Sequence, residues 1–167
     1  MLRLIVMRHA EARGAGAGEA DIDRRLSAAG QAQARRIGRL LAEAGLAPDR
    51  ALVSAAQRTR ETWDLAHEAF GDVEVEFDPA IYNAGSRELR RAVEAAEDRC
   101  GALLVLGHNP AVHQLAHDLL VEGAAAPAVQ DRLASGFPPA SAAVFEFDAA
   151  GRPSLYGVFG PGAIGGE

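Results

Sequence analysis

The stretch LRLIVMRHAEA, residues 2–12, joins an apolar run to two polar residues at its end. Residues 2–7 are almost continuously apolar rather than alternating, which is typical of a strand buried on both faces of a parallel sheet. Arg8 and His9 follow directly, and a loop of small residues comes soon after. A buried strand that ends on an arginine and a histidine raises the question of which partners the rest of the chain supplies.

Working outward from this strand, strand-like and helical patterns alternate along the chain. Apolar runs recur at 51–54, 73–77 and 102–107, and the segments 142–148 and 154–159 alternate like a hairpin. Strands that alternate with helices predict an α/β fold, a three-layer sandwich whose mostly parallel central sheet carries helices on both faces. The expected helices begin at Ser27, Ser54, Ser86 and Asn109 as N-caps, with Pro110 in the first turn of the last. The segments 12–20 and 122–141 are predicted to be long irregular loops.

Length and composition set the broad class. The 167 residues predict one domain over residues 1–160 and a flexible tail over 161–167. The net charge of −6 argues against nucleic acid or membrane partners, which call for basic patches. The apolar run at the start is too short for a membrane span and lacks the pattern of a signal peptide, so a cytoplasmic protein is expected. Cys100 is the only cysteine, which excludes an internal disulfide.

Cationic residues gather at the carboxyl ends of three predicted strands. Arg8 and His9 end the first, Arg58 lies in the first turn of the helix after the second, and His108 ends a later one. Ligands of open parallel sheets bind at this edge. Guanidinium forks match phosphate oxygens, and a neutral histidine can attack phosphorus. Because phosphoryl transfer depends mostly on positioning and charge stabilisation, these four groups would suffice without a metal.

Five segments resemble known proteins. MRHAEA, LVSAAQRTRET and LVLGHNP resemble motifs of the histidine phosphatase superfamily, also called phosphoglycerate mutase-like. DRRLSAAGQAQA and FPPASAAVFEFD resemble its short bacterial subgroup, the SixA-type phosphohistidine phosphatases. The similarity runs from residue 2 to about residue 148. It implies the phosphoglycerate mutase-like fold and a chemistry that requires neither metal nor other cofactor.

The resemblance also implies roles for single residues. His9 matches the nucleophile, and Arg8 and Arg58 match the arginines that grip the phosphate. His108 matches the second histidine, which contacts the phosphate and stabilises the transition state. Arg24 matches a residue at the rim of the site.

The chain departs from the family where many members carry a carboxylic general acid. Asn83 is nearest to that position, Asp78 lies earlier, and Glu11 follows the nucleophile by two residues. An alkoxide leaving group needs a proton, whereas a protonated phosphohistidine can release neutral imidazole, whose conjugate acid has a pKa near ~6.5. The departure therefore favours phosphohistidine as substrate, with Glu11 as the candidate acid if one is used. The lack of a long insertion between the motifs predicts an open, shallow pocket.

Three functional hypotheses remain. The first is a metal-independent phosphatase that removes phosphate from a phosphohistidine-bearing protein, such as a phosphorelay domain, through a phosphohistidine enzyme intermediate. The second is a small-molecule phosphomonoesterase of the same superfamily. The third, a phosphate-binding module without catalysis, is disfavoured by the intact set of four residues.

A zinc site is a separate alternative for two other histidines. His113 and His117 are spaced to share one face of the last predicted helix. No glutamate accompanies them as in a HExxH motif, so they are interpreted as surface or rim residues.

Overall fold

The computed structural model describes residues 1–161, so all of the predicted tail except Pro161 lies outside the described residues. Six strands form one sheet in the order β3-β2-β4-β1-β5-β6. Pairing is parallel from β3 through β1 and antiparallel from β1 through β6. The strands are β1 (Arg3–Arg8), β2 (Arg50–Ser54), β3 (Glu74–Asp78), β4 (Ala102–Gly107), β5 (Ala142–Phe147) and β6 (Pro153–Phe159).

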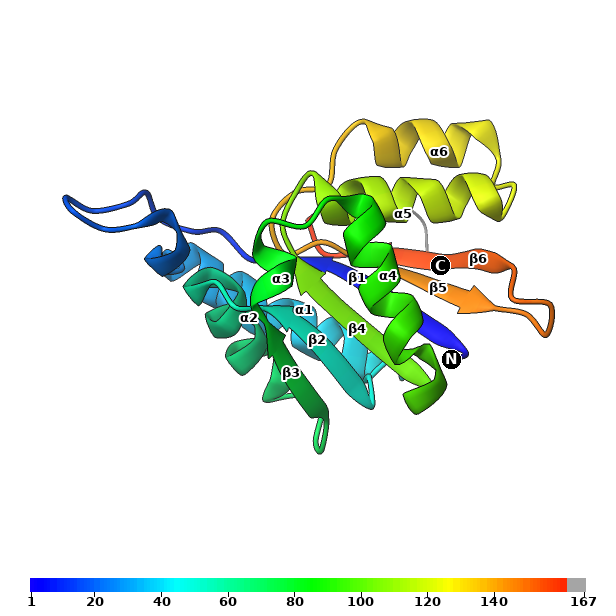
Figure 1. Cartoon of the computed structure of the whole chain (residues 1–167), viewed down its shortest axis with the longest axis horizontal. Helices are drawn as coiled ribbons and strands as arrows, with labels where there is room; N and C mark the ends of the chain where they lie inside the picture. The colour runs from blue at the N-terminus through cyan, green and yellow to red at the C-terminus, as the bar shows by residue number, and fades with distance from the viewer. Residues whose placement is uncertain (162–167) are drawn as a thin grey trace.

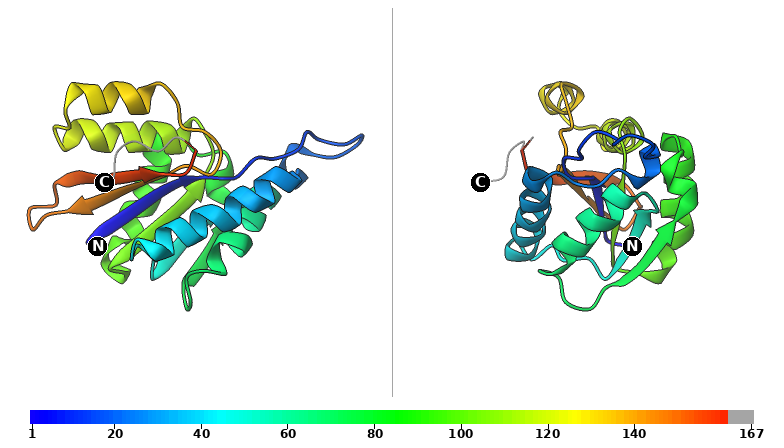
Figure 2. Two further views of the ribbon diagram at one scale, coloured as in Figure 1. Left: turned by 180° about the vertical axis from the view of Figure 1, so that it is seen from behind. Right: turned by 90° about the vertical axis from the view of Figure 1, so that its left-hand side faces the viewer.

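Helices cover both faces of the sheet (Figures 1 and 2). They are α1 (Ala28–Glu43), α2 (Gln57–His67), α3 (Pro79–Tyr82), α4 (Ser86–Ala96), α5 (Ala111–Glu122) and α6 (Pro127–Ala134). Two 3-10 turns, η1 (Asp21–Asp23) and η2 (Glu97–Arg99), complete the set. The predicted α/β sandwich with a mostly parallel sheet is confirmed. None of the helices within residues 1–161 is long and apolar enough to cross a bilayer.

Strand β1 is the centre of two hydrophobic cores. Leu4 and Val6 point to one face, where they join a core with α4 and α5. Ile5 and Met7 point to the other face, where they join a core with α1 and α2. All four side chains are at most 1% exposed, which explains why this strand is apolar at successive positions.

Three of the four predicted helix starts are wrong by one to two residues. Ser27 caps α1 as expected, with its hydroxyl accepting a hydrogen bond from the Gly30 amide at 3.0 Å. The N-cap of α2 is Ala56 and not Ser54, because the Ser54 hydroxyl is engaged by His108. Gly85 and not Ser86 precedes α4.

The start of α5 and the segment before β5 also differ from expectation. Helix α5 begins at Ala111 after Pro110, so Asn109 is not its N-cap. The Asn109 amide instead donates to the Phe137 carbonyl at 2.9 Å. The segment 122–141 is not wholly irregular, because Pro127 starts α6, which packs on α5.

Candidate active site

The two histidines expected in the site lie side by side. His9 follows the end of β1, and His108 follows the end of the neighbouring strand β4. Their ring centroids are 5.3 Å apart. Because β1 and β4 pair in parallel, with Arg8 opposite Gly107, their carboxyl ends deliver both rings to one edge of the sheet. One phosphoryl group could contact both rings.

The surroundings of His9 select one neutral form of its ring. Nδ1 lies 2.7 Å from the Ala10 carbonyl oxygen, which can only accept, so Nδ1 carries the proton. Burial lowers the pKa of His9 to about 4, and the positive charges of Arg58, Arg8 and Arg24 act in the same direction. At neutral pH the ring is therefore uncharged, with its free lone pair on Nε2. That is the form a nucleophilic histidine requires.

His108 is also held uncharged. Burial, followed by the proximity of His9 and Arg58, lowers its pKa to about 3. Its Nε2 lies 2.7 Å from the Ser54 hydroxyl oxygen at the end of β2. The sequence predicted Ser54 only as a helix cap. Its contact with His108 spans 54 residues of sequence, so no local pattern could have revealed this contact.

The two phosphate-binding candidates Arg8 and Arg58 are fixed by backbone carbonyls. Arg8 donates from Nη1 to the Phe137 carbonyl at 3.0 Å, the same carbonyl that accepts from Asn109. Arg58, on the first turn of α2, donates from Nη1 to the Asp21 carbonyl at 2.9 Å. The Arg58 side chain is only 8% exposed, so its guanidinium is held in place.

Arg24 joins this cluster through Asp21, a residue that the sequence interpretation missed. Arg24 and Arg58 both form ion pairs with the Asp21 carboxylate, at 3.1 Å and 3.2 Å. The Tyr82 hydroxyl donates to the same carboxylate at 2.5 Å, and its ring lies edge-on to His108 with centroids 5.6 Å apart. Asp21 and Tyr82 are 61 residues apart, on the short turn η1 and on a four-residue helix, and such short elements show no periodicity in the sequence.

The candidate general acids have other partners. The Glu11 carboxylate accepts from the Ser27 hydroxyl at 3.1 Å. Asp78 caps α3 by accepting from the Ala80 amide at 2.8 Å, and Asn83 ends the same helix. None of the hydrogen bonds among residues 1–161 joins these three side chains to His9 or His108.

The alternative zinc site receives no structural support. His113 Nε2 lies 2.7 Å from the Leu133 carbonyl, and the ring stacks on Phe137. Within the part of the chain that the structure describes, no three histidine, cysteine, aspartate or glutamate side chains gather in a way that could hold a metal ion. His113 thus helps to pack α6 against α5.

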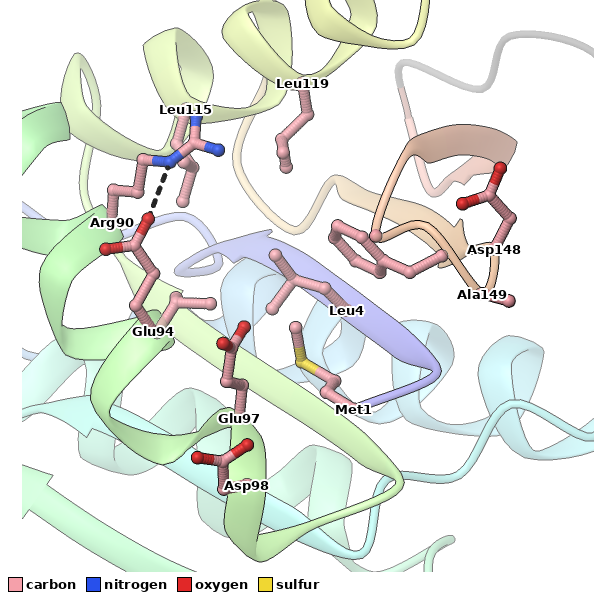
Figure 3. Close-up of a pocket in the computed structure, with 13 residues that line it drawn as sticks. Met1, Leu4, Arg90, Glu94, Glu97, Asp98, Leu115, Leu119, Asp148 and Ala149 are labelled. Carbon is pink, nitrogen blue, oxygen red and sulfur yellow. Dashed lines mark hydrogen bonds and ion pairs between the residues drawn. The ribbon is translucent and has the colours of Figure 1, made fainter.

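A groove of about 580 Å³ lies elsewhere, beside α4 and the amino end of β1 (Figure 3). Its floor is apolar and includes Leu4 and Leu115. Arg90 is paired with Glu94 and Glu122, so the rim is dominated by carboxylates. Because phosphate would be repelled there and no expected site residue lines the groove, it is separate from the histidine cluster. The rim carboxylates are Glu94, Glu97, Asp98 and Asp148.

Comparison with known proteins agrees with this geometry. The family model for the histidine phosphatase superfamily (branch 1) matches residues 4–137. The chain belongs to the histidine phosphatase superfamily. This histidine phosphatase is 32% identical over 149 residues to protein ML1117 of Mycobacterium leprae, with 87% of this chain and 89% of the relative covered.

Solved structures place this histidine phosphatase near the SixA group. A crystal structure of a protein from Agrobacterium tumefaciens that is assigned as the phosphohistidine phosphatase SixA matches with a TM-score of 0.84 and 32% identity, over 96% of this chain and 98% of that one. The alpha-ribazole phosphatase of Shigella flexneri matches with a TM-score of 0.66 and 17% identity, over 99% and 100% of the chains, which shows the shared fold alone. The chain is a phosphatase with a phosphoglycerate mutase-like fold, as the sequence predicted.

Proposed function

We propose that this phosphatase removes phosphate from a phosphohistidine side chain of a partner protein, such as a phosphorelay domain, without a metal. His9 takes the phosphoryl group as a covalent intermediate, and water then hydrolyses it. The observation that carries the proposal is the state of His9, whose Nδ1 donates its proton to the Ala10 carbonyl, so that the free lone pair of the neutral ring is on Nε2. Similarity to a SixA protein supports the substrate class.

Each step can be assigned to groups of this chain. The lone pair of His9 Nε2 attacks phosphorus while the bond to the substrate nitrogen breaks, and the leaving group departs as neutral imidazole. Arg8 and Arg58 hold the phosphoryl oxygens with charge-assisted hydrogen bonds, and the His108 ring borders the transferring group. Water then attacks the phosphorus of phosphorylated His9, which restores the histidine and releases inorganic phosphate.

The carboxylates near the cluster favour phosphohistidine over a phosphate ester. The Tyr82 hydrogen bond, followed by that of Arg24, lowers the pKa of Asp21 to about 2, so this carboxyl has no proton to give at neutral pH. Glu11 faces Ser27. An ester would have to release an alkoxide without an acid, whereas a phosphohistidine ring protonated by solvent leaves as neutral imidazole.

A direct comparison of substrates tests the proposal. The purified protein, with a chelator present, receives a phosphohistidine-bearing phosphorelay domain and, separately, an alkyl phosphate, whose alkoxide leaving group needs a proton. We expect much faster phosphate release from the phosphohistidine domain. Ester cleavage at an equal or higher rate would contradict this and favour the small-molecule phosphomonoesterase, the second hypothesis.

Variants of two histidines test the mechanism. His9→Ala should form no acid-labile phosphoenzyme and should lose turnover. His117→Ala, on α5 outside the cluster, should retain both and serves as the matched control. Full turnover by H9A would overturn the covalent mechanism.

A further inference from the structure

One carboxylate occupies Arg58, which is proposed to hold phosphate, and its neighbour Arg24. Asp21 Oδ2 accepts from Arg58 Nη2 at 3.2 Å and from the Tyr82 hydroxyl at 2.5 Å. Its Oδ1 accepts from Arg24 Nη1 at 3.1 Å. Two guanidiniums and a hydroxyl thus converge on two oxygens of one anion. The same two guanidiniums would suit two oxygens of a phosphoryl group, whereas the Tyr82 hydroxyl holds the carboxylate in place.

We propose that Asp21 is an internal competitor for the phosphate site of this phosphatase. Its carboxylate pairs with Arg24 and Arg58 when no ligand is bound, yields them to the incoming phosphoryl group, and returns to them to displace inorganic phosphate after hydrolysis. The inference rests on the proposed function and adds a role in product release. It names Asp21 as a residue that sets affinity, separate from the groups that carry out the transfer.

The difference in burial shows which partner moves. The Arg58 side chain is 8% exposed and is also held by the Asp21 carbonyl, whereas the Asp21 carboxylate is 54% exposed on the short turn η1. An exposed carboxylate regains its hydration when it rotates into water, and this offsets part of the loss of its ion pairs. Arg58 can therefore stay in place while the Asp21 side chain leaves.

The charge of Asp21 persists under working conditions. Since its pKa is lowered to about 2, the carboxylate stays ionised over the neutral range and always competes as an anion. A site with Arg8, Arg24 and Arg58 and no opposing charge would retain the dianionic product. The Asp21 carboxylate both reduces the local positive charge and occupies guanidinium donors, and both effects weaken phosphate binding.

Replacement of Asp21 by asparagine distinguishes two roles of this residue, competition with phosphate and orientation of Arg24 and Arg58. Asp21→Asn keeps the shape and an oxygen acceptor but removes the charge. We expect the Kd for inorganic phosphate to fall roughly five- to tenfold, as expected for removal of one nearby unit charge. Inhibition of turnover by added phosphate should increase to the same extent. If Asp21 only oriented the arginines, D21N would instead bind phosphate more weakly.

Two further variants complete the experiment, which measures phosphate binding by titration calorimetry on the whole protein. Asp23→Asn removes a carboxylate from the same turn and should leave the Kd unchanged. Tyr82→Phe removes one donor that holds Asp21 while every charge is kept, and should lower the Kd roughly two- to threefold. An unchanged Kd in Y82F would overturn the proposal that the Asp21 carboxylate, held by Tyr82, competes with phosphate for the arginines. Asp21 would then affect phosphate binding only through its negative charge.

The outcomes separate this inference from the function on which it rests. A D21N protein that binds phosphate no more tightly than the native protein, while the native protein hydrolyses phosphohistidine, overturns the role of Asp21 alone. Absence of phosphate binding in every variant, together with absence of hydrolysis by the native protein, overturns both proposals.

Discussion

At the scale of single residues, burial holds the two site histidines in their uncharged forms. Their pKa values are lowered from 6.5 to about 4 for His9 and to about 3 for His108. Between these values and 6.5 the unfolded chain binds more protons than the folded chain. The free energy of unfolding should therefore fall as the pH drops from about 6.5 toward about 4, by at most about 1.4 kcal/mol per pH unit for each ring.

Urea unfolding at about pH 7.5 and about pH 5 checks this expectation. The native protein should be less stable at the lower pH, and His9→Asn should lose less stability than the native protein does. His117→Asn, outside the cluster, should behave as the native protein does. A stability that is equal at both pH values would contradict the buried, neutral state of the two rings.

Arg58 illustrates what a guanidinium supplies that an ammonium does not. Arg58→Lys keeps the charge but loses the planar fork, and with it the charge-assisted hydrogen bonds that we propose Arg58 makes to the phosphoryl oxygens. We expect kcat/KM for a phosphohistidine domain to fall roughly 10- to 100-fold. Arg60→Lys, two residues along α2, is the control and should change kcat/KM little. Equal effects of both substitutions would argue against a specific role for Arg58.

At the scale of elements, α1 and α2 meet at a glycine. A Cβ atom built on Gly38 would collide with the backbone of Ala66 on α2. Gly38→Ala should therefore separate the helices and lower the free energy of unfolding by about 1–3 kcal/mol. Gly136→Ala, where nothing lies within 4 Å of the added carbon, should have little effect. Thermal or urea unfolding compares the two, and equal stabilities would show that the helices shift without cost.

The elements also show which features the sequence could predict. Strand β1 was predictable because burial on both faces makes it continuously apolar, and its end placed Arg8 and His9 correctly at the sheet edge. The predicted N-caps at Ser54 and Asn109 were wrong because α2 and α5 begin after Ala56 and Pro110, while the two side chains contact the distant residues His108 and Phe137. Local patterns carry no information about such contacts.

The missed parts of the site belong to irregular segments. Asp21 lies on η1, just beyond the loop predicted over residues 12–20, and its contacts with Tyr82 and Arg58 form only in the folded chain. Helix α6 was missed although Pro127 in its first turn is a recognised start signal, because its eight residues include one buried position, Leu133, and so show no apolar periodicity.

At the scale of the whole molecule, the two cores should unfold together because they share the strands between them. Trp63, the only tryptophan, lies in the core with α1 and α2, whereas Leu115 lies in the core with α4 and α5. Leu115→Ala should lower the free energy of unfolding by about 2–5 kcal/mol. The unfolding midpoint measured by Trp63 fluorescence should fall by as much as the midpoint measured by circular dichroism. Separate midpoints would show that the two faces unfold independently.

The central place of β1 has a consequence for hydrogen exchange. The Arg8 amide donates to the Ser141 carbonyl, and the His9 amide donates to the Gly107 carbonyl, so both lie inside the sheet between β5 and β4. Such amides exchange with solvent only when the sheet opens, whereas those of an exposed turn such as η1 exchange through local fluctuations. The backbone of Arg8 and His9 thus belongs to the most slowly opening part of the protein. The turn that carries Asp21 can open many times before the sheet opens once, so the exchange of ligands proposed for Asp21 would leave the backbone of His9 in place.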